Sequence, residues 1–125
     1  MQINDLTYQI IGCAYDVHSE LGPGLFEKTY RVCLEHVLRE KGLSVESELA
    51  LPVCFRGNQL EAGCRIDLLV EDKVIVELKA VEKLVPAHKA QVITYLRLSK
   101  ITHGLLFNFN EQNLRNGIQR VINTE

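Results

Sequence analysis

Two acidic residues, Asp67 and Glu77, lie on neighbouring apolar runs that are joined by a short polar turn, residues 71–73. If Val70 pairs with Val74 across this turn, the register of an antiparallel hairpin places Asp67 directly opposite Glu77. Opposed side chains in such a pair have Cβ atoms about 4.5–5.5 Å apart, where like charges destabilise the sheet unless a cation lies between them. Carboxylate oxygens are hard ligands that suit Mg²⁺ or Mn²⁺. A three-residue turn therefore predicts a divalent metal site on this hairpin.

The same register sorts the other side chains of the hairpin, because side chains alternate along a strand. One face is expected to be apolar and buried; it consists of Ile66, Leu68, Val70, Val74, Val76 and Leu78. The opposite face consists of Arg65, Asp67, Leu69, Ile75, Glu77 and Lys79. On this face the Lys79 ammonium group can orient a water or stabilise charge on a phosphoryl oxygen. The alternative is an exposed ladder of ion pairs with Arg65, each worth about 0–1 kcal/mol.

Two further sets of side chains are candidates for chemistry. His88, Gln91 and Tyr95 are spaced by three and four residues, so they share one stripe of a helix and can hold a phosphate oxygen or a water. Alternatively, Gln91 and Tyr95 form internal hydrogen bonds and His88 is an exposed first-turn residue. Glu27 lies at the margin of an apolar helix face, where it can reach the metal directly or through water. Its alternative is a solvated glutamate that the helix dipole favours.

Hydrophobic periodicity, glycine and proline predict the elements that position these residues. The predicted helices span residues 6–21 (after an Asn4-Asp5 cap), 25–41 and 86–100, and the predicted strands span 45–55 (interrupted at Pro52), 65–70, 74–79 and 105–109. Residues 114–122 fit a helix or a strand. The order helix, helix, three strands, helix, strand predicts an α/β (α+β) fold in which helices flank a mixed sheet.

Length and composition narrow the class of protein. A chain of 125 residues is expected to form a single domain over residues 1–125 that buries roughly two thirds of its unfolded surface. Its four cysteines lack zinc-ligand spacing and lie in apolar contexts, which predicts reduced core cysteines in a cytoplasmic protein. Residues 1–5 lack the basic and then apolar pattern of a leader, and no apolar run reaches the length of a membrane span, so an untargeted, soluble protein with no membrane partner is expected.

Charge is unevenly distributed along the chain. The net charge of −2 argues against a nucleic-acid partner, but residues 79–100 hold five basic side chains and one acidic side chain. Such a local excess of positive charge is needed by a phosphate-binding surface. The alternative is an ordinary solvated helix face.

Taken in order, these residues resemble the PD-(D/E)XK nuclease superfamily: an early helix glutamate, then an aspartate, Glu-x-Lys, and a helix with a glutamine. More narrowly, the run Gly24-Leu25-Phe26-Glu27-Lys28-Thr29-Tyr30 resembles the signature of the GxxExxY proteins, a small bacterial and archaeal group. The other matching blocks are Ile66-Asp67-Leu68, Val76-Glu77-Leu78-Lys79, His88 to Leu96, and Gly104 to Phe109. The resemblance implies a restriction-endonuclease-like core of order ααβββαβ with a short C-terminal element. It also implies an enzyme, a Mg²⁺-dependent nuclease that hydrolyses phosphodiesters of DNA or RNA.

The resemblance further implies a role for each matching residue. Asp67 and Glu77 would ligate metal together with the Leu78 carbonyl, and Lys79 would position and stabilise the attacking water. Glu27 would hold a second metal or a metal-bound water. Gln91, with Tyr95, would contact substrate or the attacking water. A homodimer is compatible with so small a hydrolase. The rival interpretation is a non-catalytic nucleic-acid-binding or protein-interaction module that retains the nuclease fold, which small size and low charge favour.

Overall fold

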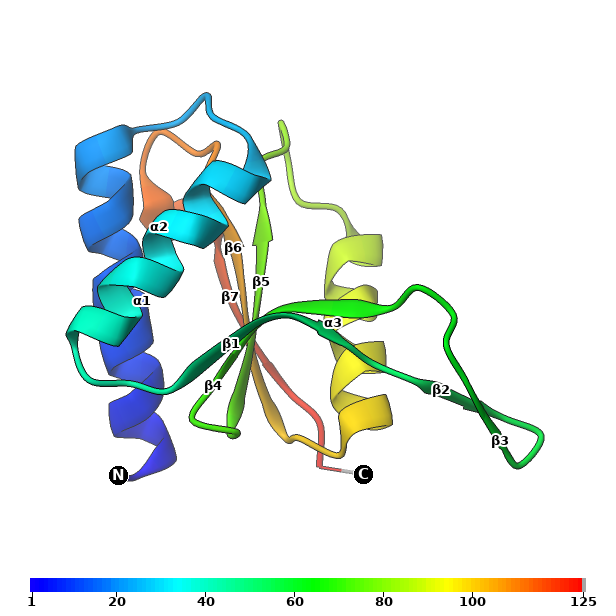
Figure 1. Cartoon of the computed structure of the whole chain (residues 1–125). Coiled ribbons are helices and arrows are strands. Elements are labelled where there is room, and N and C mark those ends of the chain that lie inside the picture. Colours follow the sequence, from blue (N-terminus) through cyan, green and yellow to red (C-terminus); the bar gives the residue numbers. More distant parts are fainter. Residues whose placement is uncertain (125) are drawn as a thin grey trace.

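A five-stranded mixed sheet separates two helices on one face from a third helix on the other in the computed structural model, which describes residues 1–124 (Figure 1). The helices are α1 (Ile3–Leu21), α2 (Glu27–Glu40) and α3 (Pro86–Ser99). The strands of the sheet, in spatial order, are β1 (Val45–Ala50), β4 (Arg65–Val70), β5 (Val74–Lys79), β6 (His103–Asn108) and β7 (Ile118–Ile122). A short 3-10 helix, η1 (Leu114–Gly117), precedes β7.

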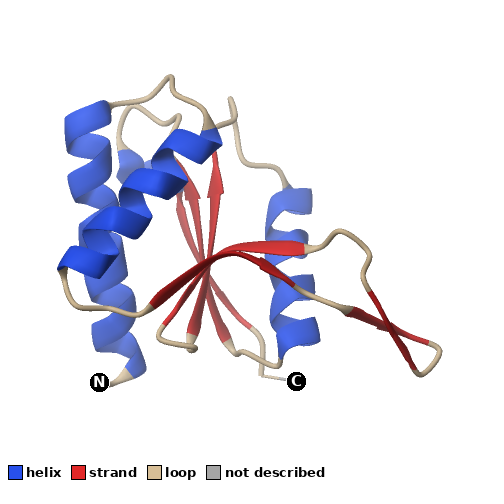
Figure 2. Ribbon diagram, viewed as in Figure 1, coloured by secondary structure: helices blue, strands red, loops and turns tan. Residues whose placement is uncertain are grey.

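The topology confirms the predicted α+β class and the restriction-endonuclease-like arrangement. Helix α3 connects β5 to β6, and these two strands are parallel, while the other neighbouring pairs of the sheet are antiparallel (Figure 2). A crossover helix is the usual connection between two parallel neighbouring strands. The chain must return from the end of one strand to the start of the next, at the opposite edge of the sheet, and a tight turn is too short for this.

Several boundaries differ from the predictions: β6 is His103–Asn108 rather than 105–109, and α2 is Glu27–Glu40 rather than 25–41. The predicted strand 45–55 divides into β1 and a separate ribbon of β2 (Val53–Phe55) and β3 (Asn58–Leu60), since Pro52 has no N–H to continue a ladder. Residues 114–122 form η1 and β7. Helix α1 begins at Ile3 rather than after an Asn4-Asp5 cap, and its N-cap residue makes no side-chain cap bond.

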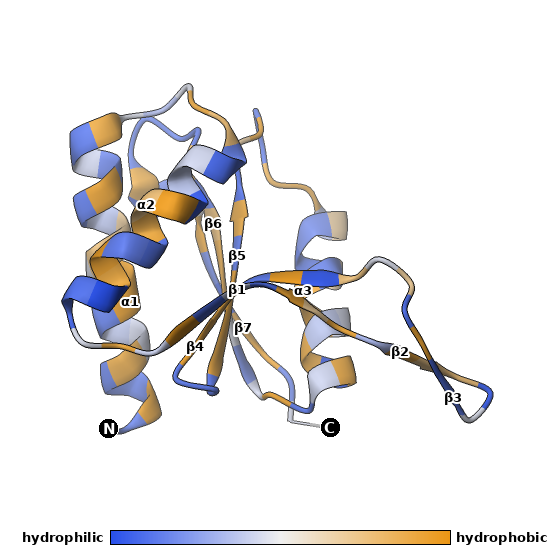
Figure 3. Cartoon of the chain, viewed as in Figure 1, coloured by the Kyte–Doolittle hydropathy of each residue, from blue (hydrophilic) through white to orange (hydrophobic). Residues whose placement is uncertain are grey.

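Two apolar cores lie on opposite faces of the sheet. The first is formed by α1, α2 and one face of the strands, and within it the rings of Tyr30 and Phe109 stack with centroids 4.7 Å apart. The second lies under α3, where Val92 and Leu96 pack on Ile75. Apolar residues accordingly line the sides of the helices and strands that face one another (Figure 3). No helix in the described part of the chain combines the length and the hydropathy that crossing a membrane requires.

Two packing predictions were wrong. Ile66 was expected beside Leu68 and Val70, but it packs in the second core, because the β1–β4 pair is distorted between these positions, where Glu48 has φ +50°. The cysteines are not all in the core: Cys13 is buried, Cys33 and Cys64 are half-buried and Cys54 is exposed on the ribbon. All four are free thiols, as predicted.

Candidate active site

The turn between β4 and β5 has the three residues that the predicted register requires. The Lys73 N–H donates to the Val70 carbonyl at 3.0 Å, and the observed pairs are Val70↔Val74, Leu69↔Ile75 and Leu68↔Val76. Glu71 and Asp72 both adopt positive φ of 55° in this turn. The Glu71 side chain stabilises it by accepting the Ser44 N–H at 2.6 Å, a bond that lowers the pKa of Glu71. The predicted register is confirmed over these pairs.

Beyond Leu68↔Val76 the two carboxylates replace the backbone ladder. The Asp67 N–H donates to Glu77 Oε1 at 3.0 Å, and the Leu78 N–H donates to Asp67 Oδ2 at 2.9 Å. Each acidic side chain therefore satisfies a backbone donor of the opposite strand. The pair lies side by side at the end of the hairpin, on the side of the sheet that faces α3.

Burial makes this pair electrostatically unusual. Glu77 is only 3 % exposed, and Asp67 is half-buried. Burial first, and the adjacent Asp67 carboxylate second, raise the pKa of Glu77 to about 9. Two like charges taken out of water without a cation are costly, so one of them keeps a proton at neutral pH. This arrangement contrasts with the exposed ion-pair ladder, in which Arg65 would neutralise the acids: Arg65 instead donates to the Glu48 carbonyl at 3.4 Å.

A chain of polar side chains connects β5 to α3 beside the acid pair. Lys79 Nζ donates to Gln91 Oε1 at 3.0 Å, and Gln91 Nε2 donates to the Tyr95 hydroxyl at 3.1 Å. Burial and then the negative charge of Glu77 raise the pKa of Tyr95. Gln91 and Tyr95 thus share the predicted helix stripe and face the strands, and they fix the lysine that follows Glu77.

His88, the third member of that stripe, caps the helix. Its Nδ1 accepts the Val85 N–H at 3.0 Å, which satisfies one of the free donors at the N-terminus of α3. The half-buried imidazole is therefore engaged in this structure, and it is not joined to Lys79, Gln91 or Tyr95 by a hydrogen bond among the described residues.

Asn108, at the end of β6, fixes the chain directly after Lys79. Its amide group accepts the Val81 N–H at 3.1 Å and donates to the Val81 carbonyl at 2.9 Å. The next residue, Phe109, donates its N–H to the Lys79 carbonyl at 2.8 Å. Asn108 was predicted only as part of a strand. Its signal in the sequence is a polar residue at the end of an otherwise apolar strand.

Glu27 occupies the first position of α2 and is exposed. The tyrosine of the same motif holds the loop before it, because the Tyr30 hydroxyl donates to the Gly22 carbonyl at 2.6 Å and accepts the Leu25 N–H at 3.1 Å. Among residues 1–124 no hydrogen bond or ion pair joins Glu27 to Asp67 or Glu77. Nor does any group of three or more His, Cys, Asp or Glu side chains there form a ready-made metal site.

Arg31, one helical turn after Glu27, contacts the strand next to the acid pair. The guanidinium is nearly buried and lies 3.4 Å from the Glu48 carboxylate. Glu48 lies between the β1 residues that pair with Ile66 and Leu68, and so at the level of Asp67. Arg31 therefore joins α2 to β1 at the level of Asp67. Arg31 was not among the predicted site residues, although an arginine four residues after Glu27 on a largely apolar helix face was an available signal.

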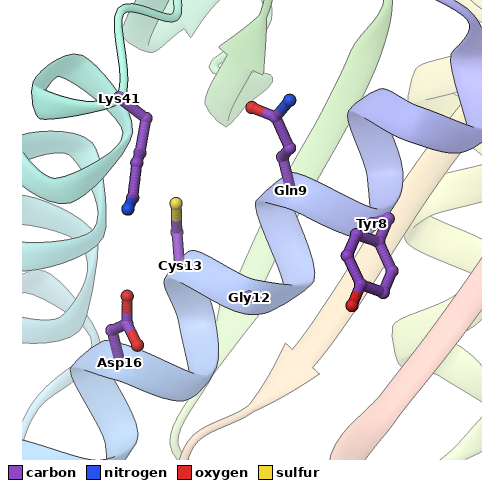
Figure 4. Close-up of a pocket in the computed structure, with 6 residues that line it drawn as sticks. All are labelled: Tyr8, Gln9, Gly12, Cys13, Asp16 and Lys41. Carbon is purple, nitrogen blue, oxygen red and sulfur yellow. The ribbon is translucent and has the colours of Figure 1, made fainter.

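A hollow of about 460 Å³ elsewhere on the molecule is unrelated to these residues. It is lined by Tyr8, Gln9, Gly12, Cys13, Asp16 and Lys41, from α1 and the end of α2 (Figure 4). Its thiol is a poor nucleophile, since burial and then the Asp16 charge raise the pKa of Cys13. None of the predicted site residues lines it, so the chemistry is expected at the acid pair.

Comparison with known proteins identifies the family. Searches of curated proteins and of solved structures gave no significant match to this chain. A family model described as the PD-(D/E)XK nuclease superfamily matches residues 4–121, which include the acid pair, Lys79, Gln91 and Tyr95. Because this match spans nearly the whole chain, the protein belongs to the PD-(D/E)XK nuclease superfamily.

Proposed function

We propose that this protein is a metal-dependent nuclease, a phosphodiester hydrolase that acts on DNA or RNA, and that it is of the GxxExxY type. The observation that carries the proposal is the interlocked pair Asp67 and Glu77 with Lys79 beside it. The superfamily match supports a nuclease-like function, and members of this superfamily generally use divalent metal ions.

The donor set fits a hard divalent cation such as Mg²⁺ or Mn²⁺. Each carboxylate uses one oxygen for the opposite backbone, Glu77 Oε1 and Asp67 Oδ2, which leaves one oxygen of each side chain for a ligand. A cation in place of the shared proton would remove the like-charge repulsion. We propose that Asp67, Glu77 and the Leu78 carbonyl hold this ion, and that Glu27 holds a second ion or a bound water. When bound, the ion supplies Lewis-acid stabilisation of charge at the scissile phosphate.

The remaining side chains have separable roles. Lys79 is a fixed positive charge beside the acids, where it orients the attacking water and stabilises the negative charge that develops on a phosphoryl oxygen. Gln91 holds the lysine at 3.0 Å and has a lone pair left for the water or the substrate. Tyr95 orients Gln91. His88, at the start of the same helix, is proposed to contact the substrate backbone.

A cleavage assay tests this proposal directly. Labelled single-stranded, double-stranded and branched DNA and RNA would be incubated with the protein in Mg²⁺ or Mn²⁺. Glu77→Gln and Lys79→Met are each expected to lower cleavage at least 100-fold, because each removes a charge that acts on the transition state. Glu46→Gln and Lys41→Met are matched controls, since both residues are exposed and lie outside the site and the basic segment 79–100. Cleavage by both site variants at the wild-type rate would refute the mechanism.

Calorimetric titration separates the enzyme from a non-catalytic module. Binding of Mn²⁺ that disappears in Asp67→Asn supports a metal-dependent hydrolase. If the wild type binds nucleic acid but binds no metal at millimolar concentration, the protein is a binding module that retains the nuclease fold.

A further inference from the structure

The β2–β3 ribbon, residues 53–60, projects away from the body of the molecule on the side that carries α3 (Figure 1). Its strands pair with each other, Val53↔Leu60 and Phe55↔Asn58, and they are not hydrogen-bonded into the main sheet. An isolated two-stranded ribbon is marginally stable in water. We call this ribbon the arm.

One face of the arm is exposed and largely apolar. Because directly paired residues share a face, Val53, Phe55, Asn58 and Leu60 lie together. Phe55 is 56 % exposed and Leu60 is 46 % exposed. The guanidinium carbon of Arg56 lies 5.3 Å from the centre of the Phe55 ring. The Arg56 guanidinium lies over one face of the exposed ring, so the ring has one face left for a nucleobase, and the cation and the nearby amide can hold its phosphate.

The conformation of the turn gives a second reason to look for a ligand of Arg56. Arg56 and Gly57 both have positive φ, 52° and 78°, as in a type I′ turn. Asn or Asp is preferred before the glycine of such a turn, and arginine is disfavoured there. Binding of an anion by the guanidinium at the tip would explain why arginine occupies this position despite its unfavourable backbone conformation.

The base of the arm shares an apolar core with Tyr95 of the candidate active site. The Leu51 N–H donates to the Cys64 carbonyl at 2.8 Å and closes the base of the arm. Leu51 packs in the same core as Tyr95, the residue that orients Gln91. Phe55 is four residues from Leu51, roughly 13 Å along an extended chain. The arm is therefore about as long, from its base to Phe55, as four nucleotides of a stacked strand.

We propose that the arm binds an unpaired strand of DNA or RNA that runs into the active site, with one base stacked on Phe55 and a phosphate held by Arg56. This inference rests on the proposed function and deepens it, since it selects substrates with single-stranded segments. The bases of an intact duplex are already stacked on their neighbours, so they offer no open face to Phe55. A second copy of the chain is a poorer fit, because a stable interface buries about 1,200–2,000 Å² and the exposed apolar strip of the arm has only a few side chains.

Fluorescence anisotropy in EDTA tests the arm without requiring cleavage. The probes are labelled single-stranded 20-mers of DNA and of RNA, and a blunt duplex of the same sequence. Phe55→Ala is expected to weaken binding of one or both single strands by about 5- to 150-fold, the range for losing one stacked base. Tyr8→Ala is the matched control, because Tyr8 is 77 % exposed on α1. The control is expected to bind like the wild type.

Arg56→Asn separates the fold of the arm from its binding role. Asparagine suits the type I′ turn, so the melting temperature is expected to stay the same or rise while single-strand affinity falls. The slope of log affinity against log salt is expected to decrease by about one, as for loss of one phosphate contact.

Three outcomes overturn the proposal: wild-type affinity of Phe55→Ala for both single strands, an equal loss of affinity for the blunt duplex, or dissociation of a wild-type dimer by Phe55→Ala in sedimentation. Cleavage of a panel of substrates by the wild type is measured separately. If single strands bind through Phe55 but nothing is cleaved, the arm is confirmed and the proposed hydrolase is not.

Discussion

Asp67 and Glu77 act as backbone caps as well as acids. In a regular ladder the strands would bond each other through main-chain groups, but here each carboxylate accepts a backbone N–H from the opposite strand. The same side chains thus complete the fold of the hairpin and are the proposed ligands. Substitutions that remove charge and substitutions that remove an acceptor should consequently have different effects.

Asp67→Ala and Asp67→Asn are expected to differ in stability. Alanine leaves the N–H of buried Leu78 without an acceptor, which costs about 1–3 kcal/mol of the free energy of unfolding. Asparagine keeps an acceptor oxygen and removes the repulsion with Glu77, so its stability should equal or exceed that of the wild type. Urea unfolding in EDTA measures both. Equal stability of the two variants would show that the Leu78 bond contributes nothing.

The raised pKa of Glu77 predicts how stability depends on pH in metal-free protein. The pKa is about 9 in the folded state and near 4.5 in the unfolded chain, so between these values the native state binds one more proton. The contribution of Glu77 to the free energy of unfolding is therefore fully present below about pH 4.5. It is lost as the pH rises through 9. Urea unfolding in EDTA from pH 5 to 9 should show a steeper decline for the wild type than for Glu77→Gln. If the free energy of unfolding depended on pH equally in both proteins, the decline would not come from titration of Glu77.

At the scale of elements, α3 is positioned by its close approach to β6. A Cβ added to Gly104 would lie 2.9 Å from Val92 Cγ1, so the helix rests directly on the strand at this point. Val92 follows Gln91 in the chain. The distance between α3 and the sheet therefore also sets where Gln91 meets Lys79.

Gly104→Ala is expected to destabilise the protein by about 1–3 kcal/mol, because the core under α3 must expand to accept a methyl group. Gly12 offers a matched control: it lies within α1 and has open space around its Cα. Gly12→Ala should stabilise by roughly 0.5–1 kcal/mol through helix propensity. Thermal unfolding measures both variants, and a neutral Gly104→Ala would mean that α3 shifts freely.

On the scale of the whole molecule, ligand binding and folding are linked. A metal that binds only the native state adds about 2.7 kcal/mol at 100 times its dissociation constant. Mn²⁺ is therefore expected to raise the Tm of the wild type and of Glu46→Gln, but not that of Asp67→Asn. EDTA should reverse the effect. A Tm increase that persists in Asp67→Asn would place the ion elsewhere.

Local pairing was the predictable part of this molecule. The register of the β4–β5 hairpin followed from a three-residue turn, and the crossover between β5 and β6 followed from a helix between two apolar strands. Both features depend on short stretches of sequence: the alternation of side chains along a strand, and the order of strand, helix and strand along the chain. The contact between Gln91 and Tyr95 likewise followed from helical spacing.

Contacts between distant segments were not predictable in this way. Ile66 moved to the second core because the partner strand is distorted at Glu48, a backbone event that hydrophobic alternation does not encode. Arg31 reaches Glu48 only because α2 crosses the hairpin at that level. The arm arose from the position of Pro52, which marked an interruption without indicating where the chain would go.

The parallel pairing of β5 and β6 also bears on how the chain folds. The acid pair belongs to a hairpin that closes over three residues, whereas Lys79 meets Gln91 only after α3 has docked and β6 has joined β5. Non-local parallel pairing is slow because loop-closure entropy must be overcome first. We expect assembly of β6 onto β5 to limit the folding rate, so that the two acids come together before the lysine beside them is held in place.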